Sequence, residues 1–303
     1  MTRKPTVAKG YSSETALVVY STALYLATKL GDLRDEIVVV GGLVPSLLIP
    51  ESASATDRPP HVGTMDVDLG LAIALLDQQR YHELCERLRG AGFEPDVNDA
   101  GNATSQRWRI NADDHRVTVD FLIPATSDSD KGGTLRHLEA GFAAVVMPGL
   151  ELAFADRQLV TLTGDTVHHE QATREIWVCG AGAFTVLKAL AFDNRGENKD
   201  AYDLIYILQN YGSSIEDVFE RLRPLLQSNA ARRALVILER DFRGIDSLGP
   251  KRLAEFLGDP SNEALRADAM GSVRALLGLE SDRGARASVS PSRAPWSKRT
   301  AGA

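Results

Sequence analysis

The chain has 303 residues, 44% of them apolar, and a formal net charge of −7 at pH 7. This length is comfortable for two domains, and the composition is that of an ordinary globular protein. No apolar run reaches about eighteen residues, so we expect no membrane-spanning helix, and the first residues lack the apolar core of a signal peptide. The two cysteines, Cys85 and Cys179, lie far apart in apolar surroundings and indicate reduced core residues and a cytoplasmic location.

The charge is unevenly distributed along the chain. Residues 281–303 contain five basic residues and one acidic residue, a net charge of +4, so the first 280 residues carry −11. Bulk charge of that sign excludes a general nucleic-acid binder, although a local basic groove or bound metal ions could still hold nucleic acid. Because residues 281–303 are rich in Ser, Pro, Arg and Ala, we predict a disordered basic tail there, with contact to RNA as one option.

The first part of the chain shows the pattern of an α/β domain, which we place at residues 1–180. Apolar periodicity, helix caps and turn residues define its elements. In chain order we expect a helix at 13–33, a strand ending in two glycines at 36–42, a short helix at 43–49, a loop at 50–62, a strand at 65–71, a helix near 75–90, two strands joined by a polar turn at 111–115, and two extended segments around 157–164 and 174–180.

The pattern becomes helical after Gly182, and we place a helical domain at residues 181–280. The sequence shows no internal repeat. We therefore expect one α/β half followed by one helical half. The expected helices lie at 184–194, 200–211, 214–227 and 230–242, with two shorter helices before residue 280.

The stretch "HVGTMDVDLGL" places two carboxylates one residue apart in an apolar strand. Because strand side chains alternate, Asp66 and Asp68 project from the same face, and the apolar residues between and after them face the other side. A third acid, Asp120, lies in the equally apolar segment "HRVTVDFLIP". Two acids in this pattern often lie on a solvent-exposed strand face. Three half-buried like charges, however, need compensation by a cation or by hydrogen bonds. Carboxylate oxygens in this arrangement suit Mg²⁺.

A pair of glycines, Gly41 and Gly42, ends the buried strand "VVV" and precedes a helix. Backbone amides at a junction of strand and helix can bind an anion. Taken alone, the pair is more often a tight turn. Together with three acids on nearby strands, it becomes a candidate phosphate site.

The order of these features resembles the nucleotidyltransferase superfamily that has the DNA polymerase β palm. The segment "FTVLKALAFDNRGENKDAYDLIYIL" resembles the signature of AbiEii-type nucleotidyltransferases, toxins of type IV toxin–antitoxin systems that include mycobacterial tRNA nucleotidyltransferase toxins. In this family one helix carries a lysine and an arginine, here Lys188 and Arg195, and the next helix opens with a basic–Asp–x–x–Asp–Leu pattern, here residues 199–204. The chain departs from the family at Gly63, where members often carry a basic residue.

The resemblance implies an α+β fold with a polymerase β-like palm, a mixed sheet flanked by helices, followed by a C-terminal helical bundle. It also implies that Asp66 and Asp68 bridge two Mg²⁺ ions, and that Asp120 completes one metal site and accepts the proton of the attacking hydroxyl.

The resemblance further assigns the nucleoside triphosphate to the glycine turn and the second helix pair. Gly41, Gly42 and Thr64 would hold its phosphates, and Lys188 and Arg195 would neutralise their charge. Asp203, on the next helix, would orient Lys188 or touch the acceptor, and makes a fifth catalytic candidate with Asp66, Asp68, Asp120 and Lys188. We treat Lys188 as an exposed helical lysine, whose replacement should leave stability unchanged, and expect it to form a basic groove with Arg195 and Lys199.

Three functions follow as candidates. The first is an enzyme that transfers a nucleoside monophosphate from a triphosphate to RNA, with tRNA as the preferred acceptor, acting as a toxin restrained by an antitoxin protein. The second is a nucleotidyltransferase with a small-molecule acceptor, as in antibiotic-modifying enzymes, which the acidic body favours. The third is a non-catalytic nucleotide-binding protein, which the complete set of three acids disfavours.

Overall fold

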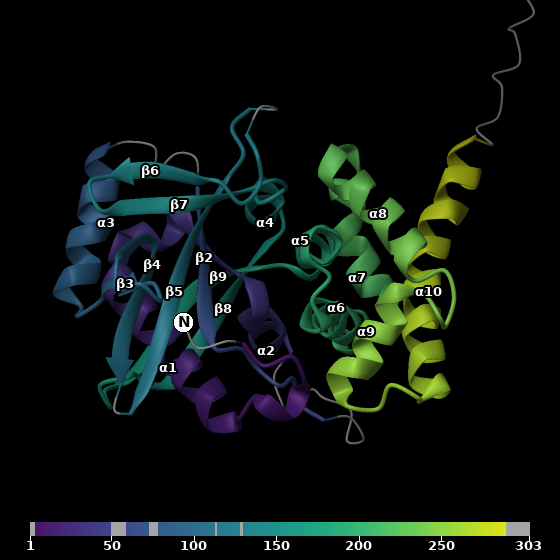
Figure 1. Ribbon diagram of the computed structural model, residues 1–303. Coiled ribbons are helices and arrows are strands. Elements are labelled where there is room, and N and C mark those ends of the chain that lie inside the picture. The colour runs from purple at the N-terminus through teal and green to yellow at the C-terminus, as the bar shows by residue number, and fades with distance from the viewer. Residues whose placement is uncertain (1–3, 50–58, 73–77, 113, 128–129, 289–303) are drawn as a thin grey trace, which may run out of the picture.

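The computed structural model describes residues 4–49, 59–72, 78–112, 114–127 and 130–288, with the backbone alone from residue 282 onward. The fold is α+β, with one mixed, open sheet between two groups of helices (Figure 1). Helices α1 (Ser13–Leu30) and α3 (Gln78–Gly90) cover one face of the sheet. Helices α5 to α10, residues 181–288, form a second body against the other face. Within these described ranges, no helix combines the length and apolar character needed to cross a bilayer.

The sheet has the strand order β3-β4-β5-β2-β1-β9-β8, and β7 extends it by pairing with the end of β5 and with β6. The central strands β2 and β5 are parallel, whereas β1 is antiparallel to β2 and parallel to β9. The described strands are β1 (Ile37–Val40), β2 (Asp66–Leu71), β3 (Glu94–Val97), β4 (Ala103–Ala112), β5 (His115–Pro124), β6 (Leu135–Glu139), β7 (Phe142–Met147), β8 (Arg157–Asp165) and β9 (Gln171–Cys179).

Burial explains why the central strands form. All four residues of β1 are buried, and Val67, Leu69 and Leu71 of β2 are 0% exposed on the face that α1 covers. Helix α1 (Ser13–Leu30) begins at a serine cap, because the Ser12 hydroxyl accepts a hydrogen bond from the Thr15 amide at 3.1 Å. It ends three residues earlier than expected, and a 3₁₀ segment follows from residue 31 to 36.

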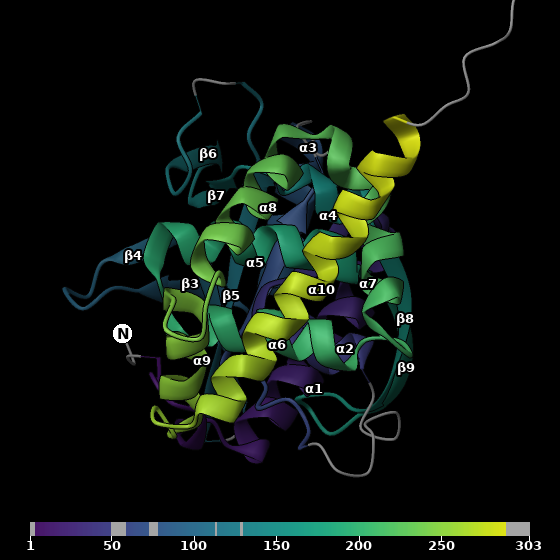
Figure 2. The same cartoon turned by 90° about the vertical axis from the view of Figure 1, so that its right-hand side faces the viewer.

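The other helices are α2 (Val44–Leu48), α3 (Gln78–Gly90), α4 (Glu151–Ala155), α5 (Ala181–Arg195), α6 (Asn198–Asn210), α7 (Ile215–Leu222), α8 (Asn229–Asp241), α9 (Leu248–Leu257) and α10 (Glu263–Ser288). Helix α5 is central to the second body and packs against α6, α7 and α8. Figure 2 shows α10 running diagonally across the outside of this body.

The end of the chain differs in part from expectation. We expected two shorter helices before residue 280. Helix α9, with 10 residues, is one of them, but α10 has 26 residues and includes residues 281–288 of the predicted disordered tail. Burial of Ala269, Val273 and Leu276 on one face stabilises the helix through Gly271, although glycine is unfavourable in a helix interior. Residues 289–303, the rest of the predicted tail, lie outside the described residues, as does most of the predicted loop at 50–62.

Candidate functional site

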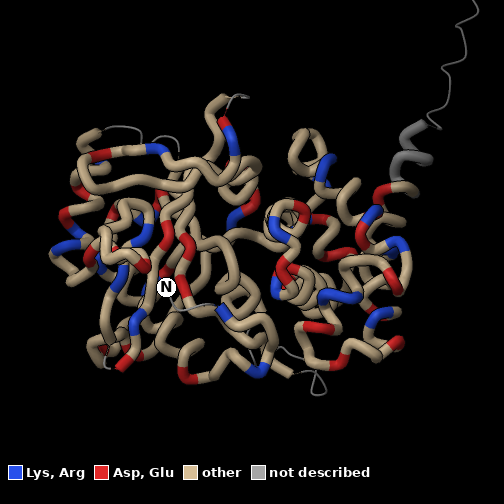
Figure 3. The backbone as a smooth tube through the Cα atoms, viewed as in Figure 1, with Lys and Arg blue, Asp and Glu red and all other residues tan. Residues whose placement is uncertain are grey.

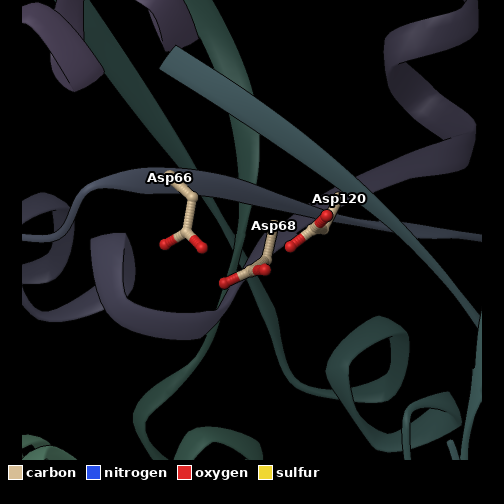
Figure 4. Close-up of side chains that lie close together, drawn as sticks. All are labelled: Asp66, Asp68 and Asp120. Carbon is tan, nitrogen blue, oxygen red and sulfur yellow. The ribbon is translucent and has the colours of Figure 1, made fainter. Parts of the chain in front are cut away.

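The three predicted acids meet on the sheet face that is turned toward the second body. Strands β2 and β5 pair with Asp68 directly opposite Asp120, and Asp66 lies two residues earlier on the same face of β2. One carboxylate oxygen from each residue lies within 4.8 Å of the others (Figure 4). Asp66 is 2% exposed, and the other two are half-buried. The sequence prediction that Asp66, Asp68 and Asp120 come together is confirmed.

Two cations that the sequence interpretation missed contact this acidic cluster. Lys4 Nζ lies 2.5 Å from Asp66 Oδ2. Arg107, directly opposite Asp120 on strand β4, donates from Nε and Nη2 to the two carboxylate oxygens of Asp120, both at 2.6 Å. Asp68 has no such ion pair within the described residues. The cluster therefore holds three acids and two cations.

The electrostatics of the cluster favour a bound cation. Burial, and next the negative charge of Asp66, raise the pKa of Asp68 to about 7. Burial also opposes the charge of Asp66, but Lys4 and a hydrogen bond from Thr64 outweigh it and hold the pKa of Asp66 below its ordinary value. Asp66 Oδ2 is buried, and its contact among the described residues is the Lys4 ammonium. These carboxylates could hold a metal ion.

The glycine pair lies directly beside the acids. Gly41 has a φ of +72°, and a Cβ at this position would overlap the carboxylate of Asp68. A Cβ on Gly42 would lie 2.8 Å from Thr64 Oγ1 and 3.3 Å from Lys199 Nζ. The turn therefore requires glycine so that its backbone can approach the site closely. Thr64 Oγ1 donates to Asp66 Oδ1 at 2.9 Å, so Thr64 orients a carboxylate of the cluster.

Opposite the acids, Lys188 lies in a buried ion-pair network and is not an exposed lysine, which corrects our expectation. Its side chain is 8% exposed, and Nζ donates to Asp200 Oδ1 at 3.0 Å and to Asp203 Oδ2 at 2.7 Å. Burial opposes the Lys188 charge, but Asp203 and Asp200 outweigh it and raise the pKa of Lys188 above its ordinary value. The i→i+3 spacing of the two acids on α6 places both on the face toward α5.

Arg195 and Lys199 complete this network. Arg195 forks onto Asp200 with two hydrogen bonds of 2.7 Å, and Lys199 Nζ donates to Asp203 Oδ1 at 2.7 Å. The three basic residues lie together as predicted, but each has an acidic partner. These pairings reduce the charge of the predicted basic groove, and the five charges together leave a net +1.

His61 is a further member of the site that the sequence interpretation did not select. Its Nε2 lies 2.9 Å from Asp203 Oδ1, and its Nδ1 accepts a hydrogen bond from the Gly63 amide at 3.1 Å and lies 3.0 Å from Ser46 Oγ. The ring stacks on Tyr202 at 5.2 Å. Burial lowers the pKa of His61 to about 4, so the ring is neutral and donates from Nε2 to Asp203. His61 thus ties the segment before β2 to helix α6.

The acidic cluster and the basic network line one cleft of about 1320 Å³ between the sheet and the second body. The two sides also interact electrostatically. The charge of Lys188 partly opposes the rise in the pKa of Asp68 that burial causes, and the charge of Asp68 adds a small contribution to the raised pKa of Arg195. Figure 3 shows acidic and basic positions interspersed along the backbone of both bodies. Compared with known proteins, the chain matches no protein-family model and no curated protein.

Proposed function

We propose that the protein is a metal-dependent nucleotidyltransferase of the AbiEii type, built on a polymerase β-like palm. The observation that carries the proposal is the convergence of Asp66, Asp68 and Asp120 in the same cleft as Lys188 and its network. These are the elements that the family resemblance names, in the same chain order. The second cluster adds weight because it comes from a separate part of the sequence.

The three acids would hold Mg²⁺, whose preferred ligands are a few carboxylate oxygens together with substrate phosphates. Bound Mg²⁺ supplies charge neutralisation at the phosphate that is attacked and at the leaving group. Asp66 is oriented for this role by Thr64, and its Oδ2 already contacts a cation, the Lys4 ammonium. Asp120 would accept the proton of the attacking hydroxyl once Arg107 yields one of its two hydrogen bonds.

The triphosphate would lie between the glycine turn and the basic network. Amides of Gly41 and Gly42 lie beside the carboxylates, and Lys199 Nζ lies next to Gly42. Lys188 would neutralise phosphate charge, and Asp203 would act as a positioning residue that keeps Lys188 charged and fixed. Arg195, which is 45% exposed, can extend from Asp200 toward a ligand at the cleft mouth.

The acceptor is proposed to be RNA, with tRNA preferred, and the protein to act in the cytoplasm as a toxin that a partner antitoxin restrains. The cleft, at about 1320 Å³, is larger than a typical small-ligand pocket of roughly 300–1,000 Å³ and leaves room for a nucleotide and the end of an acceptor. A small-molecule acceptor is the second candidate. The ion pairing of Lys188, Lys199 and Arg195 favours it, because few unpaired cations remain to bind an RNA backbone.

The test is transfer of label from each of the four α-labelled nucleoside triphosphates, with Mg²⁺, to total RNA or to a panel of aminoglycosides. Labelled RNA that disappears with chelator supports the first candidate, and labelled aminoglycoside supports the second. Asp68→Asn is the matched inactive control. Absence of transfer to any acceptor, with nucleotide binding retained, would support the non-catalytic alternative and refute the enzyme.

A further inference from the structure

The chain before α1 forms a strap, residues 4–11, that reaches the second body. Thr6 accepts a hydrogen bond from Asn198 Nδ2 of α6 at 3.4 Å, and the Tyr11 hydroxyl donates to the Pro5 carbonyl at 3.2 Å. The Tyr11 ring packs against Phe256 of α9 at 5.8 Å. In Figure 1 the purple trace leaves the N label beside the sheet and runs toward the second body before it enters α1. The strap thus borders the cleft, and four of its residues line it.

Lys4 points from the strap to the acidic cluster. Its ammonium lies 2.5 Å from Asp66 Oδ2, which is buried. The surrounding protein atoms work against the Lys4 charge, but Asp66 and then Asp68 outweigh them and raise the pKa of Lys4 above its ordinary value. Lys4 therefore supplies a positive charge at the carboxylate oxygen that is best placed to hold a metal.

Lys4 differs from the other cations of the cleft in how it is held. The Arg107 guanidinium makes a fork of two hydrogen bonds with Asp120 from within a strand, and its side chain is 22% exposed. The Lys4 side chain is 47% exposed, makes one ionic contact and projects from a segment outside the sheet. Asp66 itself is buried, but a single contact from a half-exposed, flexible side chain fixes an ammonium less firmly than a forked guanidinium is fixed.

We propose that Lys4 is a built-in counter-ion of the metal-free cluster and that a divalent cation displaces it from Asp66. Both need the same carboxylate oxygen, so they compete. Displacement leaves the ammonium at the mouth of the cleft and removes the ionic contact that holds the strap to the sheet. This inference rests on the metal site of the proposed function.

The test measures Mn²⁺ binding by the loss of the free-ion signal in electron paramagnetic resonance, because Mn²⁺ accepts the same oxygen ligands as Mg²⁺. The full-length chain is compared with Lys4→Met, Lys9→Met and Asp68→Asn at pH 8. Lys9 is exposed on the same strap and provides the matched control, since Lys9→Met makes the same change of charge away from Asp66. Lys4→Met should bind Mn²⁺ roughly tenfold more tightly than the wild type, and Lys9→Met should bind it equally.

A second readout is thermal unfolding with and without Mn²⁺. The rise in melting temperature at a fixed Mn²⁺ concentration should be larger for Lys4→Met than for the wild type or Lys9→Met, because tighter binding to the folded state stabilises it more. Equal or weaker Mn²⁺ binding by Lys4→Met overturns the inference and leaves the metal site intact. Wild-type binding no stronger than that of Asp68→Asn overturns the metal site and, with it, both proposals.

Discussion

Replacement of Lys188 by alanine distinguishes the exposed lysine that the sequence predicts from the buried ion pair that the structure shows. An exposed helical lysine could be replaced at almost no cost, but the Lys188 ammonium donates to Asp200 and Asp203, which are 1% and 0% exposed. Removing one partner of a buried ion pair costs about 3–5 kcal/mol, because the other charge stays buried. Arg195 and Lys199 still compensate the two acids, so we expect the lower end, about 3 kcal/mol.

Urea unfolding followed by tryptophan fluorescence measures the loss as a difference in the free energy of unfolding. Lys188→Met keeps an apolar stem of similar length, so its difference from Lys188→Ala reports packing and its difference from the wild type reports charge. Lys251→Ala is the control on an exposed helical site, with an expected change within about 0.5 kcal/mol. Lys188 variants as stable as Lys251→Ala would refute the buried ion-pair reasoning.

The same variants test the proposed reaction under conditions in which they are folded. Loss of a cation that contacts the triphosphate should lower kcat/KM by about two decades or more in both Lys188 variants. If the stability falls as expected while transfer stays normal, Lys188 serves only the fold. The proposed contact with the triphosphate would then be refuted.

Three further predictions use the same assays. Asp66→Asn with Asp68→Asn should lower transfer by roughly three decades or more, because it removes two of the three carboxylates that would hold the metal; near wild-type transfer would exclude this metal site. Burial lowers the pKa of His61 from 6.5 to about 4 in the folded protein. Between these pH values the unfolded chain binds a proton that the folded protein does not, so the contribution of His61 to the free energy of unfolding falls as pH decreases from about 6.5 to 4. The difference in this free energy between wild type and His61→Gln should change by about 3 kcal/mol over that range. A flat difference over that range would refute the assigned neutral ring. Binding to RNA, measured by filter retention, should weaken steeply with added salt, whereas a salt-insensitive acceptor affinity would favour the small-molecule candidate.

The acidic cluster was predictable because strand alternation places Asp66 and Asp68 on one face whatever the rest of the fold does. The partnership with Asp120 depends on the parallel pairing of β2 and β5, which follows from tertiary topology and not from local pattern. Strands β3, β6 and β7 were not predicted. Strands β3 and β6 are edge strands with exposed positions and little apolar alternation, whereas β7 is a short, largely buried apolar run, whose type periodicity alone does not determine. Their residues do not contribute to the acidic cluster.

The ion partners could not be predicted from sequence spacing. Arg107 meets Asp120 through the β4–β5 register, and Lys4 meets Asp66 only because the strap folds back onto the sheet. The burial of Lys188 depends on the packing of α5 against α6, where a helical lysine is ordinarily a solvated residue. Sequence reasoning therefore identified the candidate site residues but wrongly placed Lys188 in solvent.

The charges of the cleft nearly balance without any ligand. On the sheet side, Lys4 and Arg107 offset two of the three acids, and on the helical side two acids offset three basic residues. Internal compensation of this kind lets a polar cleft fold without a metal or a nucleotide, because few buried charges are left unpaired. It also means that a metal ion and a polyphosphate must each break ion pairs in order to bind. Binding of either ligand should therefore favour binding of the other, since a metal that releases a cation from the acids makes that cation available to a phosphate.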